Sequence, residues 1–233
     1  MTDGGCVLVV GGTRAIGFEI AKHYVEAGDD VVLTGQSQEN VDAAVAALEG
    51  RPTGLVFDLA EPHTIALALA GVGPVRHLAI VAIDRDQNSI RDYDSDRAAH
   101  LAILKLVGYA ETVHALLDRL DDSSSIVLFG GQARFLPYGG STTVTTVNGG
   151  VEGLTRSLVH ELKPIRVNCI HPGIVGDSPY WEHRQGALDA TRERTPTGRL
   201  VSMADIVAAT TFLLESPAIN GVELRVDGGL HAT

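Results

Sequence analysis

Short apolar runs alternate with amphipathic segments along this chain, and the alternation is the feature that most restricts its fold. β-branched apolar runs predict strands at 6–10, 30–34, 54–58, 77–83, 125–129, 165–170 and 221–226. Helical periodicity ending at glycines or polar residues predicts helices at 16–28, 39–50, 61–71, 95–120 and 203–215. Such alternation is typical of an α/β fold in which helices cover both faces of a parallel sheet. No linker, repeat or low-complexity tract interrupts it, so we expect one domain over residues 1–233.

One segment gives conflicting signals. The β-branched, glycine-rich TTVTTVNGG at 142–150 has the propensity of a strand, whereas the VEGLTRSLVHEL that follows it has helical spacing. Local propensity therefore does not decide the structure of this segment.

Charge and composition exclude several classes of protein. The 18 Lys and Arg residues against 29 Asp and Glu give a net charge of −11, which makes nucleic acid and anionic membranes poor partners. No apolar run is long enough to span a bilayer, and no basic segment precedes the first one, so we expect a cytoplasmic protein. The two cysteines, Cys6 and Cys169, are expected to be buried and reduced, and the nine histidines show no metal-ligand spacing.

The first predicted strand leads directly into GGTRAIG (11–17), which opens a helix. Small residues there let the backbone approach a pyrophosphate, and the helix N-terminus presents N–H groups and a positive dipole to it. A tight strand-to-helix turn without a ligand would look similar, but the N-terminal strand–loop–helix context favours dinucleotide binding.

The end of the second predicted strand points to the type of dinucleotide. Sites for NAD usually place an acidic residue there to hold the ribose hydroxyls, and this chain has Gly35, Gln36 and Ser37 instead. Arg14 could pair with a 2′-phosphate, so NADP(H) is favoured over NAD(H). The alternative is that Arg14 is only a solvated side chain.

Several motifs in order along nearly the whole chain resemble the short-chain dehydrogenase/reductase family. The matching segments are GGTRAIG, Asp58-Leu59, GVEGLTRSLVHEL (150–162), IRVNCIHPG (165–173) and GVELRVDGG (221–229). The resemblance implies a doubly wound Rossmann fold with seven parallel strands, a homotetramer or homodimer, and a small-molecule substrate. It also implies that 142–150 begins a long helix rather than a strand.

The resemblance further implies which residues contact the cofactor. VAID (81–84) takes the place of the family's Asn-Asn-Ala-Gly segment, and Pro172-Gly173 would flank the nicotinamide. The predicted cofactor contacts are Gly11, Thr13, Arg14, Ala15, Ile16, Gln36, Ser37, Asp58, Leu59, Val81, Ala82, Ile83, Asn148, Pro172, Gly173 and Val175.

The family's catalytic set is absent. Its chemistry uses a Tyr to move the proton, a Lys to lower the pKa of that Tyr, and a Ser to polarise the carbonyl. By the resemblance, the Ser position falls on Gly131, the Tyr position on Val144 and the Lys position on Asn148, and a further helical Asn falls on His100. No YxxxK lies nearby to restore the pattern by a shift of register.

Other residues are candidates to replace the missing groups. Tyr138 precedes the helix and is either a proton donor or a rim residue; Ser141, Thr145 and Asn148 share one helical face. We select Tyr138, Ser141 and Asn148 as candidate catalytic residues, although such hydroxyls often only bond to their own helix. The remaining candidates are His171 as a proton carrier, and Gln132 and Arg134 as groups that orient a polar substrate.

Three functions remain open from the sequence. The first is an atypical NADP(H)-dependent oxidoreductase acting on a small carbonyl or alcohol, with a replaced or water-mediated proton donor. The second is a non-catalytic NADP-binding sensor or assembly protein. The third is a non-redox enzyme that reuses the cleft for elimination or addition.

Overall fold

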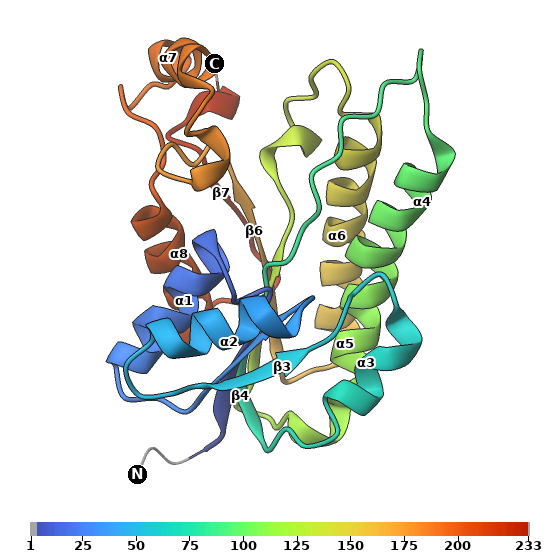
Figure 1. Ribbon diagram of the computed structural model, residues 1–233, viewed down its shortest axis with the longest axis vertical. Coiled ribbons are helices and arrows are strands. Elements are labelled where there is room, and N and C mark those ends of the chain that lie inside the picture. Colours follow the sequence, from blue (N-terminus) through green and yellow to red (C-terminus); the bar gives the residue numbers. More distant parts are fainter. Residues whose placement is uncertain (1–3, 233) are drawn as a thin grey trace.

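A seven-stranded parallel sheet forms the centre of the protein in the computed structural model, which describes residues 4–232 (Figure 1). The strands are β1 (Cys6–Val10), β2 (Val31–Gly35), β3 (Thr53–Val56), β4 (Val75–Ile80), β5 (Ser125–Phe129), β6 (Arg166–Pro172) and β7 (Glu223–Val226). Their order is β3-β2-β1-β4-β5-β6-β7, and every neighbouring pair is parallel. The predicted fold class, a doubly wound Rossmann sheet, is confirmed.

Helices cover both faces of this sheet, and each face has its own apolar core. Helices α1, α2 and α8 pack on one face around Ile20, Val41 and Ile206, while α3 to α6 pack on the other around Tyr109 and Val151 (Figure 1). Their bounds are α1 (Ala15–Glu26), α2 (Gln38–Ala47), α3 (Pro62–Ala68), α4 (Ser95–Ala102), α5 (Tyr109–Ala115), α6 (Thr142–Glu161), α7 (Gln185–Arg194) and α8 (Met203–Glu215). Because the central strands are buried on both sides, they are mostly apolar rather than alternating between apolar and polar residues.

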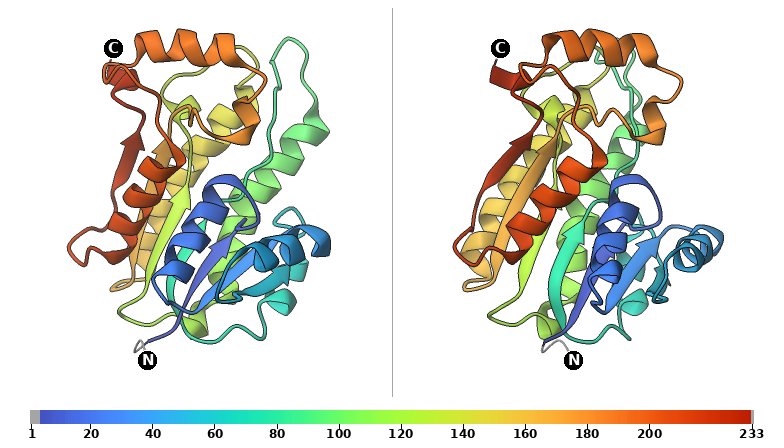
Figure 2. Two further views of the ribbon diagram at one scale, coloured as in Figure 1. Left: turned by 60° about the vertical axis from the view of Figure 1, so that its left-hand side comes forward. Right: turned by 90° about the vertical axis from the view of Figure 1, so that its left-hand side faces the viewer.

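The strand order reverses between β1 and β4. The chain runs outward from β1 through β2 to β3, then returns to place β4 on the other side of β1. Connections therefore leave in opposite directions at the carboxyl ends of these two strands, which is where open α/β sheets bind ligands. Helix α7 lies across this same end of the molecule (Figure 2).

Three segments show where local sequence signals were insufficient. The strand propensity of 142–150 is overridden, because this segment begins α6, as the family resemblance implied. The helix expected over 95–120 is broken by a π-helical turn at Ile103–Gly108, between α4 and α5. Helix α7 was not predicted, since it buries only Leu188 and so has no apolar periodicity.

Cys6 and Cys169 are both buried and free, as expected. Within residues 4–232, no helix combines the length and the apolar character needed to cross a membrane.

Substituting alanine at two glycines should have opposite effects on stability, because one glycine is required by close backbone packing and the other is an ordinary helix residue. A Cβ on Gly17 would lie 2.1 Å from the carbonyl oxygen of Gly11, whereas a Cβ on the exposed Gly153 of α6 meets nothing within 4 Å. We expect Gly17→Ala to lower the free energy of unfolding by about 1–3 kcal/mol through overpacking. Gly153→Ala should raise it by up to about 1 kcal/mol, because alanine favours helix. Urea denaturation of both variants measures the difference, and equal effects would contradict the close approach.

Candidate functional site

The turn between β1 and α1 brings backbone unusually close to backbone. Gly17 packs on the Gly11 carbonyl so tightly that no side chain fits between them, and the Gly11 N–H donates to Thr34 Oγ1 at 3.3 Å. Ala15 has a φ of +46°, a left-handed conformation that is strained for a residue other than glycine. Helix α1 begins directly after Arg14 with no side-chain cap, so its first N–H groups remain available to an anion.

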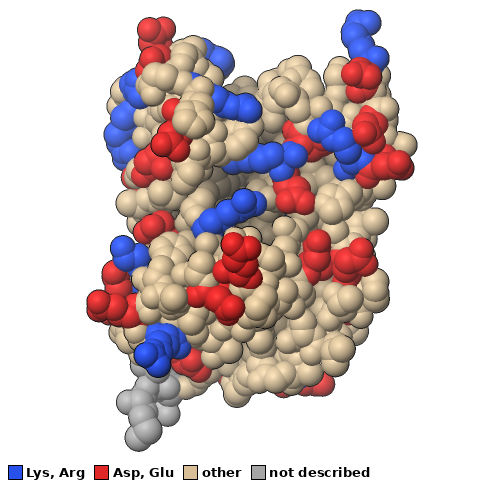
Figure 3. Space-filling model, viewed as in Figure 1, with Lys and Arg blue, Asp and Glu red and all other residues tan. Residues whose placement is uncertain are grey.

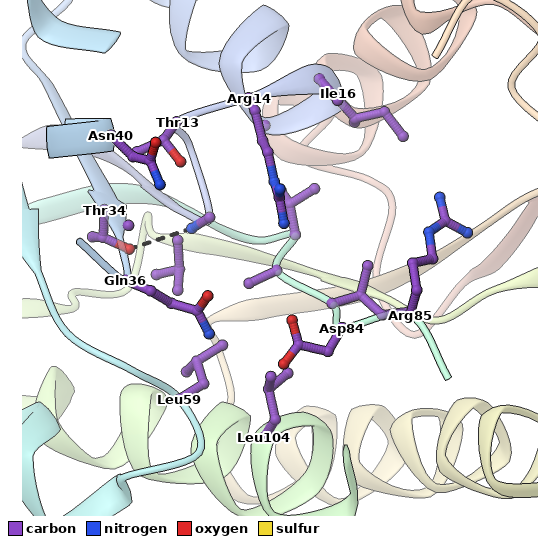
Figure 4. A pocket seen from close by; sticks show the side chains of 18 of the residues that line it. Thr13, Arg14, Ile16, Thr34, Gln36, Asn40, Leu59, Asp84, Arg85 and Leu104 are labelled. Carbon is purple, nitrogen blue, oxygen red and sulfur yellow. Dashed lines mark hydrogen bonds between the residues drawn. The ribbon is translucent and has the colours of Figure 1, made fainter. Parts of the chain in front are cut away.

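A first cavity of about 430 Å³ opens on this turn (Figure 4). Arg14 extends into it from the turn, and Gln36 and Asn40 lie on the side of β2 and α2. The predicted cofactor contacts that line it are Gly11, Thr13, Arg14, Ala15, Ile16, Gln36, Leu59, Val81, Ala82 and Ile83. Asn40 is a lining residue that the sequence analysis missed.

Two predicted cofactor contacts, Ser37 and Asp58, line neither this cavity nor the second one described below. The Ser37 side chain caps α2 by accepting the Asn40 N–H. Asp58 accepts hydrogen bonds from Gln36 Nε2 at 3.3 Å and from the Ala60 N–H at 2.8 Å. Both residues act here on the local backbone or a neighbouring side chain, and their predicted contact with the adenosine part stays a prediction.

A second cavity, of about 510 Å³, continues from the first past Ile83, Arg85 and Tyr180, which line both. The other four predicted cofactor contacts lie on its walls: Asn148, Pro172, Gly173 and Val175. The structure thus brings residues from the ends of β1, β4 and β6 to one continuous hollow.

Asn148 takes up the space left at Gly131. A Cβ on Gly131 would lie 2.6 Å from Asn148 Nδ2, so the amide occupies the volume that a side chain at 131 would need. Asn148 is only 1% exposed, and within residues 4–232 its Oδ1 has no hydrogen-bond partner. A buried amide oxygen without a partner is costly, and a hydrogen-bond donor on a ligand would satisfy it. Val144, one turn earlier on α6, adds only an apolar surface to the same cavity.

Lys105 is a cavity residue that the sequence analysis did not single out. It lies in the π-helical turn, is fully buried, and its ammonium donates to the carbonyls of Phe129 and Gly130 and to the Tyr109 hydroxyl. Burial lowers the pKa of Lys105 to about 7. A single charged residue inside the apolar run ILKLVG (103–108) was the signal that could have found it.

The candidate hydroxyls on α6 are already engaged. Ser141 Oγ accepts the Tyr138 N–H at 2.9 Å and lies 3.0 Å from Thr145 Oγ1, which in turn donates to the Ala133 carbonyl. Neither Ser141 nor Thr145 lines the second cavity, so their placement favours a structural role. Tyr138 does line it, is 55% exposed, and has a pKa raised by partial burial, which the nearby Arg85 opposes.

Two further candidates are held away from the cavity. His171 is buried behind the Gly130–Gly131 backbone, where its Nδ1 accepts the Gly131 N–H at 3.1 Å. Burial lowers the pKa of His171 to about 4, with Arg134 contributing, so the ring is neutral at physiological pH. Arg134 forms ion pairs with Glu152 and Glu223 rather than facing the cavity.

Gln132 and His100 complete the predicted set. Gln132 lines the cavity and donates to Asp227 Oδ2 at 3.0 Å. His100, expected at the family's helical Asn position, lies at the edge of the fold with its Nε2 2.8 Å from Asp84 Oδ2. On this stretch of helix, the polar side chain that lines the cavity is Lys105 instead.

The sequence and the fold match one family over nearly their whole length. The family model described as enoyl-(acyl carrier protein) reductase matches residues 10–231. The 3-oxoacyl-[acyl-carrier-protein] reductase of Bos taurus is 30% identical over 97% of each chain, and carbonyl reductase family member 4 of Danio rerio is 30% identical over 96% of this chain and 97% of its own. This chain belongs to the short-chain dehydrogenase/reductase family.

A solved structure of this family shows how closely the backbone is shared. The MalC reductase/Diels-Alderase from Malbranchea aurantiaca superimposes with a TM-score of 0.91 at 25% identity, covering 99% of this chain and 96% of that one. Short-chain dehydrogenases/reductases are oxidoreductases that use nicotinamide cofactors, and the residues present here fit such a cofactor. The turn from Gly11 to Gly17 is packed so closely that Gly11, Gly12 and Gly17 have no room for a side chain, and this turn lines the first cavity. Asn148 offers a buried oxygen that has no hydrogen-bond partner among residues 4–232.

The low pKa of Lys105 should make the free energy of unfolding depend on pH. Its pKa is about 7 in the folded chain and about 10.4 when unfolded, so between these values the unfolded chain binds more protons. Stability should therefore rise with pH across this window, by at most about 1.4 kcal/mol per pH unit. We expect Lys105→Met to lose this slope, and Lys22→Met, at the surface of α1, to keep it. Urea unfolding at pH 7, 8 and 9 tests this, and parallel slopes in all three proteins would contradict it.

Proposed function

We propose that the chain is an NADP(H)-dependent oxidoreductase for a small carbonyl or alcohol substrate, with a proton donor that is not a tyrosine of α6. The observation that carries this is that the glycine turn opens on the first cavity and that this cavity continues into the second. We call the part of the second cavity lined by Lys105, Gly130 and Asn148 its floor, and the Asn148 oxygen there has no hydrogen-bond partner among residues 4–232. NADP(H), when bound, supplies or accepts the hydride. The reductase names of the relatives support the same reaction class.

The preference for NADP(H) rests on charge at the adenosine end of the first cavity. Arg14 extends into it, and within residues 4–232 no carboxylate lies within 4.0 Å of its side-chain nitrogens. Gln36 and Asn40 present amides where an NAD-selective site would present a carboxylate. A guanidinium facing neutral amides suits a 2′-phosphate better than a free hydroxyl pair.

For the proton, the placement favours Lys105, with Tyr138 as the alternative. Lys105 lies at the floor beside Gly130, and its pKa of about 7 lets it release and regain a proton near neutral pH. Its burial means that the proton would pass through water in the cleft rather than directly. Asn148 would position the substrate or the ribose through its amide, and Val144 would only exclude water.

A non-redox reaction is the second candidate, and one observation favours it. Val144 and Gly131 offer no acid at the positions where the family needs one. MalC, with a similar fold, is described as both a reductase and a Diels-Alderase, and a cycloaddition needs no proton donor. A non-catalytic NADP-binding sensor is the third candidate.

We also propose that the protein works in the cytoplasm as a homotetramer or homodimer, as its family commonly does. Ile103 and Val107 are 37% and 50% exposed, one turn apart on the outer face of the π-helical turn. An exposed apolar pair of this kind fits an interface between helices of two copies.

Removing the charge of Arg14 tests the choice of cofactor. We expect Arg14→Ala to weaken NADPH binding by about 10- to 100-fold, the loss of a charge-assisted contact, and to change NADH binding by less than about threefold. Titration followed by nicotinamide fluorescence measures both, with the exposed Arg91→Ala as the control. Equal losses for the two cofactors would remove the 2′-phosphate argument, and no binding by the wild type at millimolar NADPH would defeat the proposed function.

The pH dependence of turnover separates the two proton donors. If the Lys105 ammonium supplies the proton, kcat for NADPH-dependent reduction of an aldehyde panel should fall tenfold per pH unit above about pH 7. Tyr138→Phe should keep this profile, and Lys105→Met should abolish it. A profile that is flat to pH 9 in the wild type and lost activity in Tyr138→Phe would assign the proton to Tyr138 instead. NADPH binding without turnover of any aldehyde would favour the non-redox or sensor function.

A further inference from the structure

Basic side chains gather on the second cavity although the chain as a whole is acidic. Lys105 lies at the floor, and three arginines also line the cavity: Arg85, Arg184 and Arg194. Figure 3 shows Lys and Arg side chains bordering the hollow on the face of the molecule viewed there. With a net charge of −11 for the whole chain, this concentration of positive charge is local to the cavity.

The carboxylates on the same cavity are already paired with other residues. Asp84 Oδ2 lies 2.8 Å from His100 Nε2, and Asp86 forms an ion pair with Arg97. Neither His100 nor Arg97 lines the cavity. Across residues 4–232, no carboxylate lies within 4.0 Å of the side-chain nitrogens of the three cavity arginines. The cavity therefore carries cations without their own counter-ions.

An aromatic ring holds two of these arginines near each other. The Cζ atom of Arg85 lies 3.9 Å from the ring centre of Tyr180, and the Cζ atom of Arg184 lies 4.7 Å from it. Both guanidiniums thus lie on one ring through cation–π contacts, and among residues 4–232 no side-chain hydrogen bond or ion pair engages their N–H groups. Burial lowers the pKa of Arg85. The nearby Tyr180 and Tyr138 oppose this lowering, whereas Arg14 and Arg184 add to it by like-charge repulsion. A bound anion would relieve this repulsion.

Two of these arginines lie outside the first cavity, which we assign to the cofactor's phosphates. Arg14 lines only the first cavity, Arg85 lines both, and Arg184 and Arg194 line only the second. Arg184 is the N-cap of α7 and Arg194 is its last residue, and this helix lies across the carboxyl ends of the strands (Figure 2). These two charges are therefore placed on the substrate side.

We propose that the substrate is an oxyanion, a carboxylate or a phosphate ester, whose charged end is bound by Arg184 and Arg85 at the Tyr180 ring, with Arg194 as a further cation on the same cavity. The other end of the molecule, which carries the carbonyl or alcohol, then reaches the floor beside Asn148. This assignment of the reacting end rests on the proposed function. The assignment of the charged end rests on the arginines alone. The planar N–H fork of arginine matches the oxygens of a carboxylate and of a phosphate. We therefore expect the site to select negatively charged ligands over neutral ones, whether the charged group is built on carbon or on phosphorus.

Binding of three matched probes tests the proposal without turnover. The probes are 4-(hydroxymethyl)benzoate, 4-(hydroxymethyl)phenyl phosphate and the neutral methyl ester of the first. Isothermal titration in a Hepes buffer, with and without NADPH, should show at least one anion binding about tenfold or more tightly than the ester. The anion that binds more tightly distinguishes carboxylate from phosphate, and raising the salt concentration should reduce only the anion affinities.

Variants on the same helix provide the control. We expect Arg184→Gln and Arg194→Gln each to reduce the preference for the anion by about tenfold and to leave ester binding unchanged. Arg192→Gln is the matched control, because Arg192 belongs to α7, pairs with Asp189 and does not line the cavity. Equal affinity for anions and ester in the wild type, or an equal loss in Arg192→Gln, would overturn the proposal.

The NADPH titration keeps this test separate from the proposed function. Anion preference without NADPH binding would defeat the proposed function and leave the oxyanion site standing. NADPH binding without anion preference would defeat only the oxyanion site.

Discussion

The reversal of strand order between β1 and β4 is the constraint on which the rest of this structure depends. Parallel strands need crossover connections, and the crossovers from these two strands leave toward opposite edges of the sheet. Their carboxyl ends are therefore left uncovered by the main helices. The glycine cradle, the two joined cavities and the arginines around α7 all lie at this opening.

Gly131 and Asn148, where the resemblance would place the Ser and the Lys, are physically connected. Asn148 fills the space that a side chain at 131 would need, so glycine at 131 and asparagine at 148 accommodate each other. Restoring a serine at 131 alone would require Asn148 to move. Lys105 brings a titratable amine to the same cavity from the π-helical turn Ile103–Gly108, where its ammonium donates to the Phe129 carbonyl. The proposed proton route thus depends on a rearranged floor rather than on one substituted residue.

Most of the fold could be predicted from local sequence. The β-branched runs gave every strand to within a few residues, and the glycine-rich GGTRAIG gave the cradle with Arg14 at its rim. Local propensity failed at 142–150, because burial of Val147 beside Leu101 of α4 and of Val151 in the core against the sheet outweighs the strand preference of the Thr and Val residues in this segment. It also missed α7, whose polar sequence carries no periodic apolar signal.

By itself, the sequence determined the family, the parallel sheet and the close-packed glycine turn after the first strand, because these depend on residue type and order along the chain. Only the tertiary structure decided which side chains share the cavity. It placed Ser141 and His171 in local hydrogen bonds, and it gathered Lys105, Arg85, Arg184 and Arg194 from separate segments. Burial and unpaired charge are properties of the packed chain, since they depend on neighbours that are distant in sequence.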